Sequence, residues 1–517
     1  MTEERRAADG SWAIATPHWL ATDAGARAFE SGGNALDAAL AAATSLTVVL
    51  PDNCGLGGDL IALVRDPTGR STVVNASGPA AERTSSDDLR RRHGAAMPVY
   101  GPDTVTVPGL LAGWEALWTH GARLPWADAF TVATAQARDG IPTARSVANA
   151  LAEEARRIAA DEGMRAVFYP DGQPLRPDAP LRQPRLAETL ERVAADGARA
   201  FYAGELGRRW LAHMASRGSV LTGDDLASFE PEITSPLKAT RGCQEILTAP
   251  PNSQGVLLLM ILGALDAADP HLDPMSADAP RLAAAFDDAV RARQSYLADP
   301  RSSDSPSELV TRILGGDTPT AASAPTAPRA HRGDTVAIVA ADAEGRAVSL
   351  IQSLYYAFGA GILDPATGII AHNRGSHFSL DPGSPNVIAP GKRPAHTLMP
   401  VLAEERGALR AVLGTMGGSA QPQILTHLLL HLRRGASCDS ALGAPRWLVM
   451  PGEAGVVAVE PAVPDEAVRA LTAAGWARRV ISASPPEAGQ AQLIVAGRDG
   501  AYRAASDPRS QGAARTG

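Results

Sequence analysis

The apolar positions of the chain follow two patterns. Between residues 35 and 46, apolar side chains cover nearly all faces of a helical projection, which predicts a helix buried on most sides. Asn34 directly precedes this segment and is a suitable N-cap. Residues 60–64 are all apolar and follow the glycine-rich turn 53–59, which predicts a buried strand. The N-terminal region therefore combines helices and strands.

The same mixture continues to the middle of the chain. Residues 110–300 have a mostly helical pattern interrupted by proline and glycine, with a strand-like segment at 245–248. Residues 335–341 are predicted to form a second buried strand. The turn 342–345 and the apolar segment 347–353 then predict its hairpin partner.

The segment before this hairpin has a different character. Residues 315–334 consist largely of Gly, Pro, Ser, Thr and Ala, which predicts a linker or exposed loop. It ends abruptly at Thr335, the first residue of the predicted strand. This junction is the most informative point in the chain.

Composition and charge narrow the classes of protein that fit. The chain has 517 residues and is 45% hydrophobic, which is enough for two to four domains of about 150 residues or one large fold. Its net charge is −8 and it has no basic run, so nucleic acid is not expected as a partner. Only two of its 48 basic residues are lysines, Lys238 and Lys392, which draws attention to any motif that contains one.

Cysteine spacing and targeting signals favour a cytoplasmic protein. Cys54, Cys243 and Cys438 are scattered and form no CxxC motif or disulfide framework. The N-terminus lacks the apolar stretch of about 7–15 residues found in secretory signals. No apolar stretch reaches the roughly 20 residues needed to cross a bilayer, so no membrane partner is expected.

The junction at Thr335 permits nucleophilic chemistry. A threonine hydroxyl is a weak nucleophile unless a base lies beside it. Cleavage of the preceding peptide bond would free an α-amine with a pKa of about 7.7–8.0, which is able to act as that base. The alternative is that residues 333–335 are only a turn that enters a strand.

Downstream features favour the chemical interpretation. Ser353 follows eighteen residues later, where the hairpin would return its hydroxyl to Thr335. Gly417 and Gly418 form a turn before a helical segment, where backbone N–H groups are free to face an anion. Lys392 lies in the Gly-Lys-Arg-Pro segment between them.

At this point the chain resembles the γ-glutamyltransferase family of N-terminal-nucleophile (Ntn) hydrolases, from about residue 12 to residue 480. The motifs are individually short, but their number and order make the resemblance specific. They are Gly32-Gly33-Asn34-Ala35-Leu36-Asp37-Ala38-Ala39, Gly55-Leu56-Gly57-Gly58, Val107-Pro108-Gly109, Leu124-Pro125-Trp126, Phe201-Tyr202-Ala203-Gly204-Glu205, Pro250-Pro251-Asn252-Ser253-Gln254-Gly255, Gly391-Lys392-Arg393-Pro394 and Gly417-Gly418.

This resemblance implies an α+β fold, a four-layer αββα sandwich, and a precursor that cleaves itself between Asp334 and Thr335. The products would be a large, mostly helical subunit (1–334, with 315–334 as an exposed linker) and a small catalytic subunit (335–517). They would form a heterodimer, or a dimer of heterodimers. By position, Thr335 corresponds to the nucleophile, Ser353 to the hydroxyl that orients it, and Gly417 and Gly418 to the oxyanion hole. No cofactor and no metal are implied.

Departures from the family pattern fall on positions that read the substrate. Asn75 occupies the place of the arginine that grips the glutamyl α-carboxylate. In the segment 372–378, Asn373 is retained, Arg374 replaces Glu or Gln, and His377 replaces an aspartate that binds the α-amino group. Elsewhere, His396-Thr397 replaces a Ser-Ser pair and Tyr355 replaces an asparagine. The residues expected to bind substrate are therefore Asn75, Tyr355, Asn373, Arg374, His377, His396 and Thr397.

The change in charge alters the expected substrate. The aspartate that would bind an ammonium group is replaced by His377, and Arg374 adds a guanidinium group nearby. This change favours an acyl group with a carboxylate but no α-amino group. The alternative for Arg374 is a structural salt bridge. His372, His377 and His396 lack a carboxylate or cysteine at ligand spacing, so polar contacts are expected rather than a metal site.

The motifs are most similar to the cytoplasmic γ-glutamyltransferase-like branch that includes oxamate amidohydrolase. The expected activity is hydrolysis of a small, oxamate-like substrate through an acyl-enzyme on Thr335. Three alternatives remain open. These are γ-glutamyl hydrolysis or transfer with glutathione-like substrates, C–C hydrolysis that releases an oxalyl fragment in 4-alkylproline antibiotic biosynthesis, and a catalytically inactive binding protein.

Overall fold

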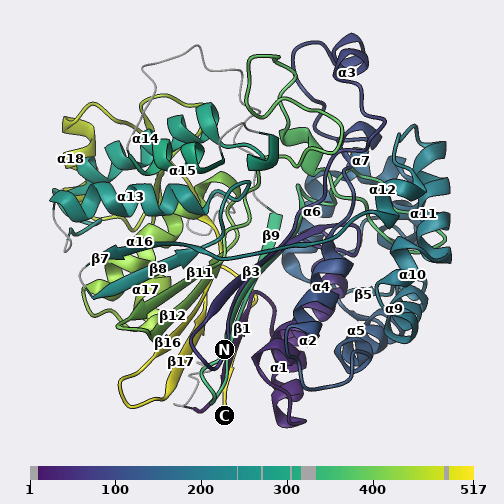
Figure 1. Cartoon of the computed structure of the whole chain (residues 1–517), viewed down its shortest axis with the longest axis horizontal. Helices are drawn as coiled ribbons and strands as arrows, with labels where there is room; N and C mark the ends of the chain where they lie inside the picture. Colours follow the sequence, from purple (N-terminus) through teal and green to yellow (C-terminus); the bar gives the residue numbers. More distant parts are fainter. Residues whose placement is uncertain (1–9, 242, 269–271, 303–305, 316–333, 483–487) are drawn as a thin grey trace.

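The computed structural model describes residues 10–241, 243–268, 272–302, 306–315, 334–482 and 488–517, and Figure 1 shows their arrangement. Most of the segment predicted to be a linker, 315–334, lies outside these residues. Two large antiparallel sheets form the centre of the molecule, with helices on the outer side of each. The predicted α+β class is confirmed.

The first sheet contains the strand that begins at the predicted nucleophile. Its seven strands are, in spatial order, β18 (Ala513–Thr516), β1 (Ala13–Thr16), β9 (Asp334–Ala341), β10 (Ala347–Tyr355), β2 (Asp59–Arg65), β3 (Ser71–Ala76) and β6 (Glu232–Thr234). The predicted strands 60–64, 335–341 and 347–353 all lie in this sheet. β9 and β10 are central and fully covered on both faces, which explains their unbroken apolar sequence.

The second sheet packs against the first. Its strands are, in spatial order, β17 (Tyr502–Ser506), β16 (Ala491–Ala496), β12 (Ala408–Thr415), β11 (Val401–Glu405), β8 (Gln244–Thr248) and β7 (Leu237–Arg241). The core between the sheets joins Ile61, Val339 and Ile351 of the first sheet with Leu402 and Val412 of the second. These side chains alternate along their strands with others that face the helices.

Helices cover the outer face of the first sheet. They include α1 (Trp19–Glu30), α2 (Ala35–Val49), α4 (Leu110–Thr119) and α5 (Asp128–Asp139). Every residue of α2 is buried, and its N-terminus has a capping box in which Asn34 and Asp37 bond to each other's backbone N–H groups. The predicted buried helix and its N-cap are therefore confirmed.

Helices on the outer face of the second sheet include α13 (Gly255–Ala268), α14 (Ala279–Tyr296), α16 (Gln421–Arg433) and α17 (Cys438–Gly443). Ile424 and Leu428 of α16 pack on Leu413 and Leu493 of the sheet. α14 and α16 each contribute to the site described below.

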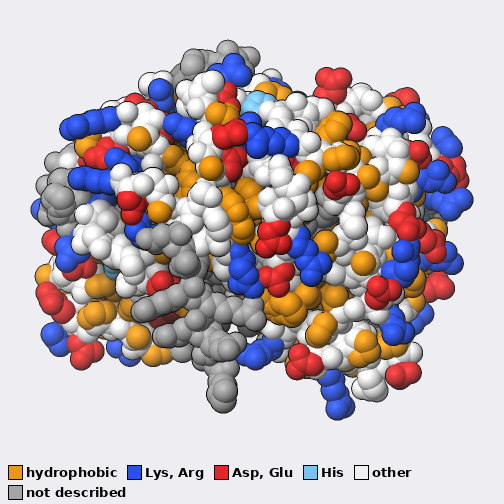
Figure 2. Space-filling view, turned by 90° about the horizontal axis from the view of Figure 1, so that it is seen from below, with side chains coloured by type: hydrophobic (Ala, Val, Ile, Leu, Met, Phe, Trp, Pro, Cys, Tyr) orange, Lys and Arg blue, Asp and Glu red, His pale blue; other side chains and the backbone are white. Residues whose placement is uncertain are grey.

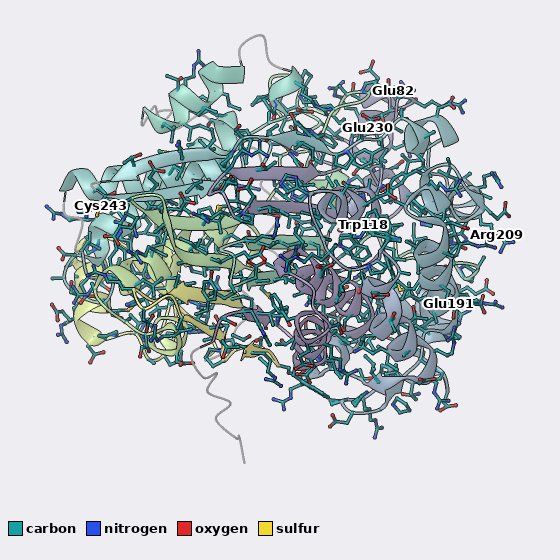
Figure 3. The ribbon with its side chains drawn as sticks, turned by 60° about the horizontal axis from the view of Figure 1, so that its bottom comes forward. Glu82, Trp118, Glu191, Arg209, Glu230 and Cys243 are labelled. Carbon is teal, nitrogen blue, oxygen red and sulfur yellow. The ribbon has the colours of Figure 1, made fainter. Side chains whose placement is uncertain are left out.

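The remaining elements surround this frame. They are α3 (Ser86–His93), α6 (Arg145–Glu153), α7 (Ala155–Ala160), α8 (Glu162–Phe168), α9 (Pro184–Asp196), α10 (Arg199–Tyr202), α11 (Glu205–Ser216), α12 (Gly223–Ala227), α15 (Pro306–Leu314), α18 (Asp465–Ala473), a small sheet of β13 (Trp447–Val449), β14 (Val456–Val459) and β15 (Ala477–Val480), and the pair β4 (Ile141–Pro142) and β5 (Pro180–Leu181). The helices α9 to α11 lie together at the edge of the molecule farthest from the second sheet, where Glu191 and Arg209 are labelled in Figure 3.

The distribution of charge on the surface and the state of the cysteines can be compared with what the sequence predicts. On the face shown in Figure 2, Lys and Arg side chains are interspersed with Asp and Glu side chains rather than gathered in one basic patch. Cys54 and Cys438 are buried, Cys243 is exposed at an edge of the molecule (Figure 3), and all three are free thiols. No helix in the described ranges is long and apolar enough to cross a membrane.

Candidate active site

The site is centred on the hairpin of β9 and β10. Thr335 is the second residue of β9, and Ser353 lies near the end of β10, where a register shift between Gln352 and Tyr355 interrupts regular pairing. The bulge changes the local direction of β10, and the Ser353 side chain reaches the start of β9. The Thr335 Oγ1 and Ser353 Oγ atoms are 3.0 Å apart and buried.

Ser353 also contacts the peptide bond that precedes Thr335. Its hydroxyl donates to the Asp334 carbonyl oxygen at 2.7 Å and accepts the Tyr355 N–H at 2.8 Å. Since the Ser353 proton is used on the carbonyl, the Thr335 hydroxyl must donate to Ser353 Oγ. One serine therefore touches both the hydroxyl and the carbonyl that a self-cleavage at this bond would involve.

The glycine turn predicted at 417–418 lies at the N-terminal side of α16. Gly417 and Gly418 have φ angles of +135° and +53°, which side chains rarely adopt, and a Cβ on Gly417 would come within 2.5 Å of Ile424 Cδ1. Neither glycine N–H donates to another described residue. Met416, which directly precedes the turn, and Asp334 line the same cleft.

Arg374 is the most unusual charged residue of the site. It begins the short 3₁₀ helix Arg374–His377 and is 1% exposed. Its Nη1 donates to Thr397 Oγ1 at 3.0 Å, and its guanidinium carbon lies 3.4 Å from the centre of the Tyr355 ring. Its Nε and Nη2 atoms have no hydrogen-bond partner among the described residues.

The environment of Arg374 does not resemble a structural salt bridge. No carboxylate of the described residues lies within ion-pair distance of its guanidinium group. Burial lowers the pKa of Arg374, an effect partly offset by Tyr355 and Tyr356. A buried cation with two unsatisfied nitrogen atoms is costly, and such groups are usually retained for a function.

Two aromatic residues and His377 extend this cluster. The rings of Tyr355 and Tyr356 stack with centres 4.1 Å apart, and the Tyr356 hydroxyl donates to the Tyr355 hydroxyl oxygen at 3.1 Å. His377 Nδ1 lies 3.0 Å from the same Tyr355 oxygen. Its Nε2 lies 2.9 Å from Nη2 of Arg293, which belongs to α14.

His396 is directed at a buried aspartate instead. Its Nε2 lies 3.1 Å from Asp59 Oδ2, and its Nδ1 accepts the Leu398 N–H at 3.2 Å. Burial lowers the pKa of His396 to about 4, so the ring is neutral and both nitrogen atoms are occupied by protein groups. His372 Nδ1 lies 3.5 Å from the same carboxylate oxygen.

The two asparagines of the predicted substrate site are also bonded to protein. The Asn75 amide donates to Asn252 Oδ1 at 2.9 Å and accepts from the backbone and hydroxyl of Ser77. The Asn373 amide accepts the Tyr356 N–H at 3.1 Å and donates to the Val99 carbonyl at 2.7 Å. Both asparagines hold loops of the site in place.

Of the residues predicted to bind substrate, the structure thus brings Tyr355, Arg374, His377 and Thr397 into one contact network. Lys392 lies apart from this network's contacts. Its Nζ donates to the Pro385 carbonyl at 2.7 Å, which gives this rare lysine a role in holding its own loop.

Sequence reasoning missed three residues of the site. Asp59 directly follows the Gly57-Gly58 motif, and Gln254 lies inside the Pro-Pro-Asn-Ser-Gln-Gly motif, so attention to the polar members of these motifs would have found both. Gln254 Nε2 donates to the carbonyls of Thr397 and Gly418, each at 2.8 Å. Arg293 had no local signal, because it is one of several arginines on a helix.

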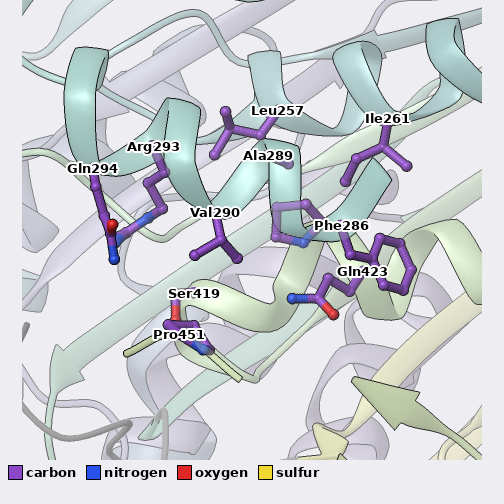
Figure 4. Close-up of a pocket in the computed structure, with 11 residues that line it drawn as sticks. Leu257, Ile261, Phe286, Ala289, Val290, Arg293, Gln294, Ser419, Gln423 and Pro451 are labelled. Atoms are coloured by element: carbon purple, nitrogen blue, oxygen red, sulfur yellow. The ribbon is translucent and has the colours of Figure 1, made fainter. Parts of the chain in front are cut away.

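Arg293 also borders a pocket between α13, α14 and the start of α16 (Figure 4). The pocket is lined mainly by apolar side chains, among them Leu257, Ile261 and Phe286, with Ser419 on the side of the glycine turn. Thr335 is not among the residues that line it. Nor does any part of the chain that the structure describes hold a group of three potential metal ligands.

Comparisons with known proteins assign the chain to a family. The family model for gamma-glutamyltranspeptidase matches residues 21–517. A glutathione hydrolase-like YwrD proenzyme of Bacillus subtilis is 32% identical over 97% of both chains. An oxamate amidohydrolase proenzyme of Klebsiella pneumoniae is 33% identical over 96% of this chain and 97% of its own.

A solved structure shares the whole architecture. The crystal structure of cephalosporin acylase from Bacillus halodurans superposes with a TM-score of 0.90 at 29% identity, and covers 100% of this chain and 98% of its own. The match of the family model to nearly the whole chain, together with these relatives, is decisive. The chain belongs to the gamma-glutamyltranspeptidase family and is an enzyme of the Ntn-hydrolase class.

Proposed function

We propose that this enzyme processes itself between Asp334 and Thr335 and then hydrolyses a small amide whose acyl group carries a carboxylate beside the attacked carbonyl, as in oxamate. The observation that carries the proposal is the buried guanidinium group of Arg374, which has two nitrogen atoms without a partner among the described residues. This guanidinium group lies on the ring of Tyr355. Tyr355 lies opposite Asp334 in the hairpin, so the guanidinium group is close to the proposed cleavage site.

Self-processing follows from the contacts of Ser353. Thr335 Oγ1 attacks the carbonyl carbon of Asp334 while Ser353 donates to the carbonyl oxygen, so that negative charge on this oxygen is stabilised. The C–N bond breaks, the freed amine takes up the hydroxyl proton, and the Asp334 acyl group becomes an ester on Thr335. Water then hydrolyses the ester to give a large subunit (1–334) and a small subunit (335–517).

The same atoms then serve the turnover of substrate. The freed α-amine of Thr335 has an ordinary pKa of about 7.7–8.0, so near neutral pH its unprotonated form accepts the proton from Oγ1. Oγ1 attacks the amide carbon, and the N–H groups of Gly417 and Gly418 stabilise the oxyanion. The amine leaves with the proton, and water hydrolyses the acyl ester.

The charges around the pocket support a substrate without an α-amino group. A guanidinium group recognises a carboxylate through paired, charge-assisted hydrogen bonds. Among the described residues, the carboxylate whose charge acts on Arg374 is that of Asp59, whose oxygens already accept from His396 and from the Gly78 N–H. A γ-glutamyl ammonium group would therefore find no uncommitted carboxylate in this network.

The proposal is tested by comparing substrates. Purified, processed enzyme would be assayed with oxamate, with its longer homologue succinamate and with γ-glutamyl-p-nitroanilide. We expect oxamate to be hydrolysed best and the γ-glutamyl amide poorly. Replacement of Arg374 by methionine should raise the KM for oxamate by about tenfold to a hundredfold, the effect of losing a charged hydrogen bond.

A matched control is Arg208→Met, which changes an exposed arginine on α11 that pairs with Glu205. Efficient γ-glutamyl turnover that Arg374→Met leaves unchanged would contradict the proposal and favour the glutathione-like alternative. Release of oxalate from a carbon-linked oxalyl compound, without activity on amides, would favour C–C hydrolysis. The heterodimer, its further pairing and the cytoplasmic location remain predictions.

A further inference from the structure

Arg293 forms a polar contact with the proposed substrate pocket from another layer of the fold. It projects from α14, its Nε donates to Gln254 Oε1 at 3.2 Å, and its Nη2 lies 2.9 Å from His377 Nε2. Burial lowers the pKa of Arg293 only to about 10, so it remains a cation at neutral pH. Its side chain is visible at the edge of the pocket in Figure 4.

This contact determines the tautomer of His377. A guanidinium group only donates hydrogen bonds, so Nε2 must be the acceptor. Burial, with the positive charges of Arg293 and Arg374, holds the pKa of His377 well below its ordinary value, and the ring is neutral. The one ring proton therefore lies on Nδ1.

The proton on Nδ1 in turn orients the Tyr355 hydroxyl. Nδ1–H donates to the Tyr355 oxygen at 3.0 Å, and the Tyr356 hydroxyl donates to the same oxygen at 3.1 Å. Both lone pairs of the Tyr355 oxygen are then occupied. Its own proton must point elsewhere, and no described residue accepts it.

The backbone holds Tyr355 in this position. Its φ angle is +84°, an uncommon value for a bulky residue that is retained only where the surroundings enforce it. The ring is fixed between the guanidinium group of Arg374 and the ring of Tyr356. The free O–H of Tyr355 therefore belongs to the same small region as the two unpartnered nitrogen atoms of Arg374.

We infer that the Tyr355 hydroxyl donates a hydrogen bond to the substrate carboxylate beside Arg374, and that Arg293 is a positioning residue which aims this hydroxyl through His377. The inference rests on the proposed function, because the carboxylate is that of the proposed substrate. It adds the Tyr355 hydroxyl as a donor that determines specificity. It also adds Arg293, 62 positions away in the sequence, as the residue that orients this hydroxyl.

Kinetic analysis of four variants tests this relay. Tyr355→Phe, Arg293→Met, Arg293→Lys and the double variant Arg293→Met/Tyr355→Phe would be compared in the processed enzyme, with kcat and KM for oxamate and the inhibition constant of oxalate as readouts. Arg291→Met, which alters the same helix at an arginine paired with Asp287 and Asp288, is the control.

We expect Tyr355→Phe and Arg293→Met to raise KM and the oxalate inhibition constant by about tenfold, with kcat within about twofold, because a donor to a charged group is lost or misaligned. Arg293→Lys should restore much of the affinity, since lysine also only donates. The double variant should have about the same KM and oxalate inhibition constant as Tyr355→Phe alone, because both changes affect the same hydrogen bond.

The pH dependence separates this role from a purely structural one. The groups that face His377 are Arg293 from α14, Arg374 from its own 3₁₀ helix, Tyr355 from β10 and His396 from the following loop. Removing Arg293 should raise the pKa of His377, because one of the positive charges that lower it is lost, while burial and Arg374 still hold it below its ordinary value. The KM of Arg293→Met should then begin to change at a higher pH than the KM of the parent enzyme as the pH is lowered, because His377 is protonated more easily in the variant.

Two results would overturn the inference. One is an unchanged KM and oxalate inhibition constant in Tyr355→Phe. The other is full additivity of the two single variants, since residues that act through one another are not additive. Either result leaves the proposed function intact, whereas processed parent enzyme without oxamate hydrolysis would instead reject the proposed function.

Discussion

The Ser353 hydroxyl lies 3.0 Å from Thr335 Oγ1 and 2.7 Å from the carbonyl oxygen of Asp334, so one side chain bridges the two groups that self-cleavage would join. The bulge at the end of β10 produces this contact. Regular pairing continues on the other side of β10, where Ser353 lies opposite Asp59 of β2. The proposed chemistry therefore depends on an irregularity in an otherwise regular central sheet.

Replacing Ser353 by alanine should slow processing without unfolding the protein. The variant loses a hydrogen bond to the oxygen on which negative charge develops, and such a donor is worth about a hundredfold in rate. Gel densitometry over time after synthesis measures the effect. Ser349→Ala is the matched control, because Ser349 lies on the same strand and donates to the Leu413 carbonyl. Equal processing rates in the two variants would contradict the role of Ser353.

Replacing Gly417 by alanine should lower kcat. The φ angle of +135° strains any residue that has a Cβ, and this Cβ would also displace Ile424 Cδ1, so we expect the turn to move and the proposed oxyanion donors with it. We expect kcat to fall at least about tenfold. Gly407→Ala is the control, since Gly407 also has a positive φ, +77°, but a Cβ there would meet no described atom within 4 Å. Unchanged kcat in Gly417→Ala would remove this turn from the mechanism.

Replacing Arg374 by methionine should weaken substrate binding and stabilise the fold together. Two buried nitrogen atoms without partners among the described residues lower stability, and each such group costs about 1–3 kcal/mol. The variant gains about 2–6 kcal/mol from the two atoms but loses the bond to Thr397 and the contact with the Tyr355 ring, so we expect its free energy of unfolding to rise by about 1–3 kcal/mol in urea denaturation. A loss of several kcal/mol would instead indicate that Arg374 stabilises the fold.

Asp52 should make stability depend on pH. Burial raises the pKa of this carboxyl group to about 7, against 3.8 for the ordinary group, despite opposing bonds from the backbone N–H groups of Asp52 and Asn53. The folded state thus keeps a proton that the unfolded state releases, and stability falls as the pH rises from about 4 to 7. Asp52→Asn should remove this loss.

The measurement is the melting temperature of Asp52→Asn and of the parent protein at pH 5 and pH 8. The variant's advantage in the free energy of unfolding should be larger at pH 8 than at pH 5, by up to roughly 3 kcal/mol, because part of the effect is already present at pH 5. Asp128→Asn, on the surface-facing start of α5, controls for the change in net charge. An advantage that is equal at both pH values would contradict the assignment.

The sequence predicted the parts of this molecule that depend on local pattern. The capped helix after Asn34, the β9–β10 hairpin and the return of Ser353 to Thr335 all follow from periodicity and turn residues. The family was predicted from the number and order of short motifs. The local structure and the motifs can both be read from short stretches of the chain.

What could not be predicted depends on contacts between distant segments. Arg293 reaches His377 from another layer, and no helical pattern marks which arginine of α14 does so. His396 was predicted to bind substrate, and the sequence does not show that its two ring nitrogen atoms bond to Asp59 and Leu398. Only the tertiary arrangement shows which polar side chains are already satisfied and which, like that of Arg374, are not.

The most direct test of the central claim is the intact mass of the purified protein under denaturing conditions. If Thr335 is the N-terminal nucleophile, the parent chain should give two fragments, one ending at Asp334 and one beginning at Thr335, and Thr335→Ala should remain whole. A single uncleaved species of 53.6 kDa from the parent protein, under conditions where it is folded, would contradict the account.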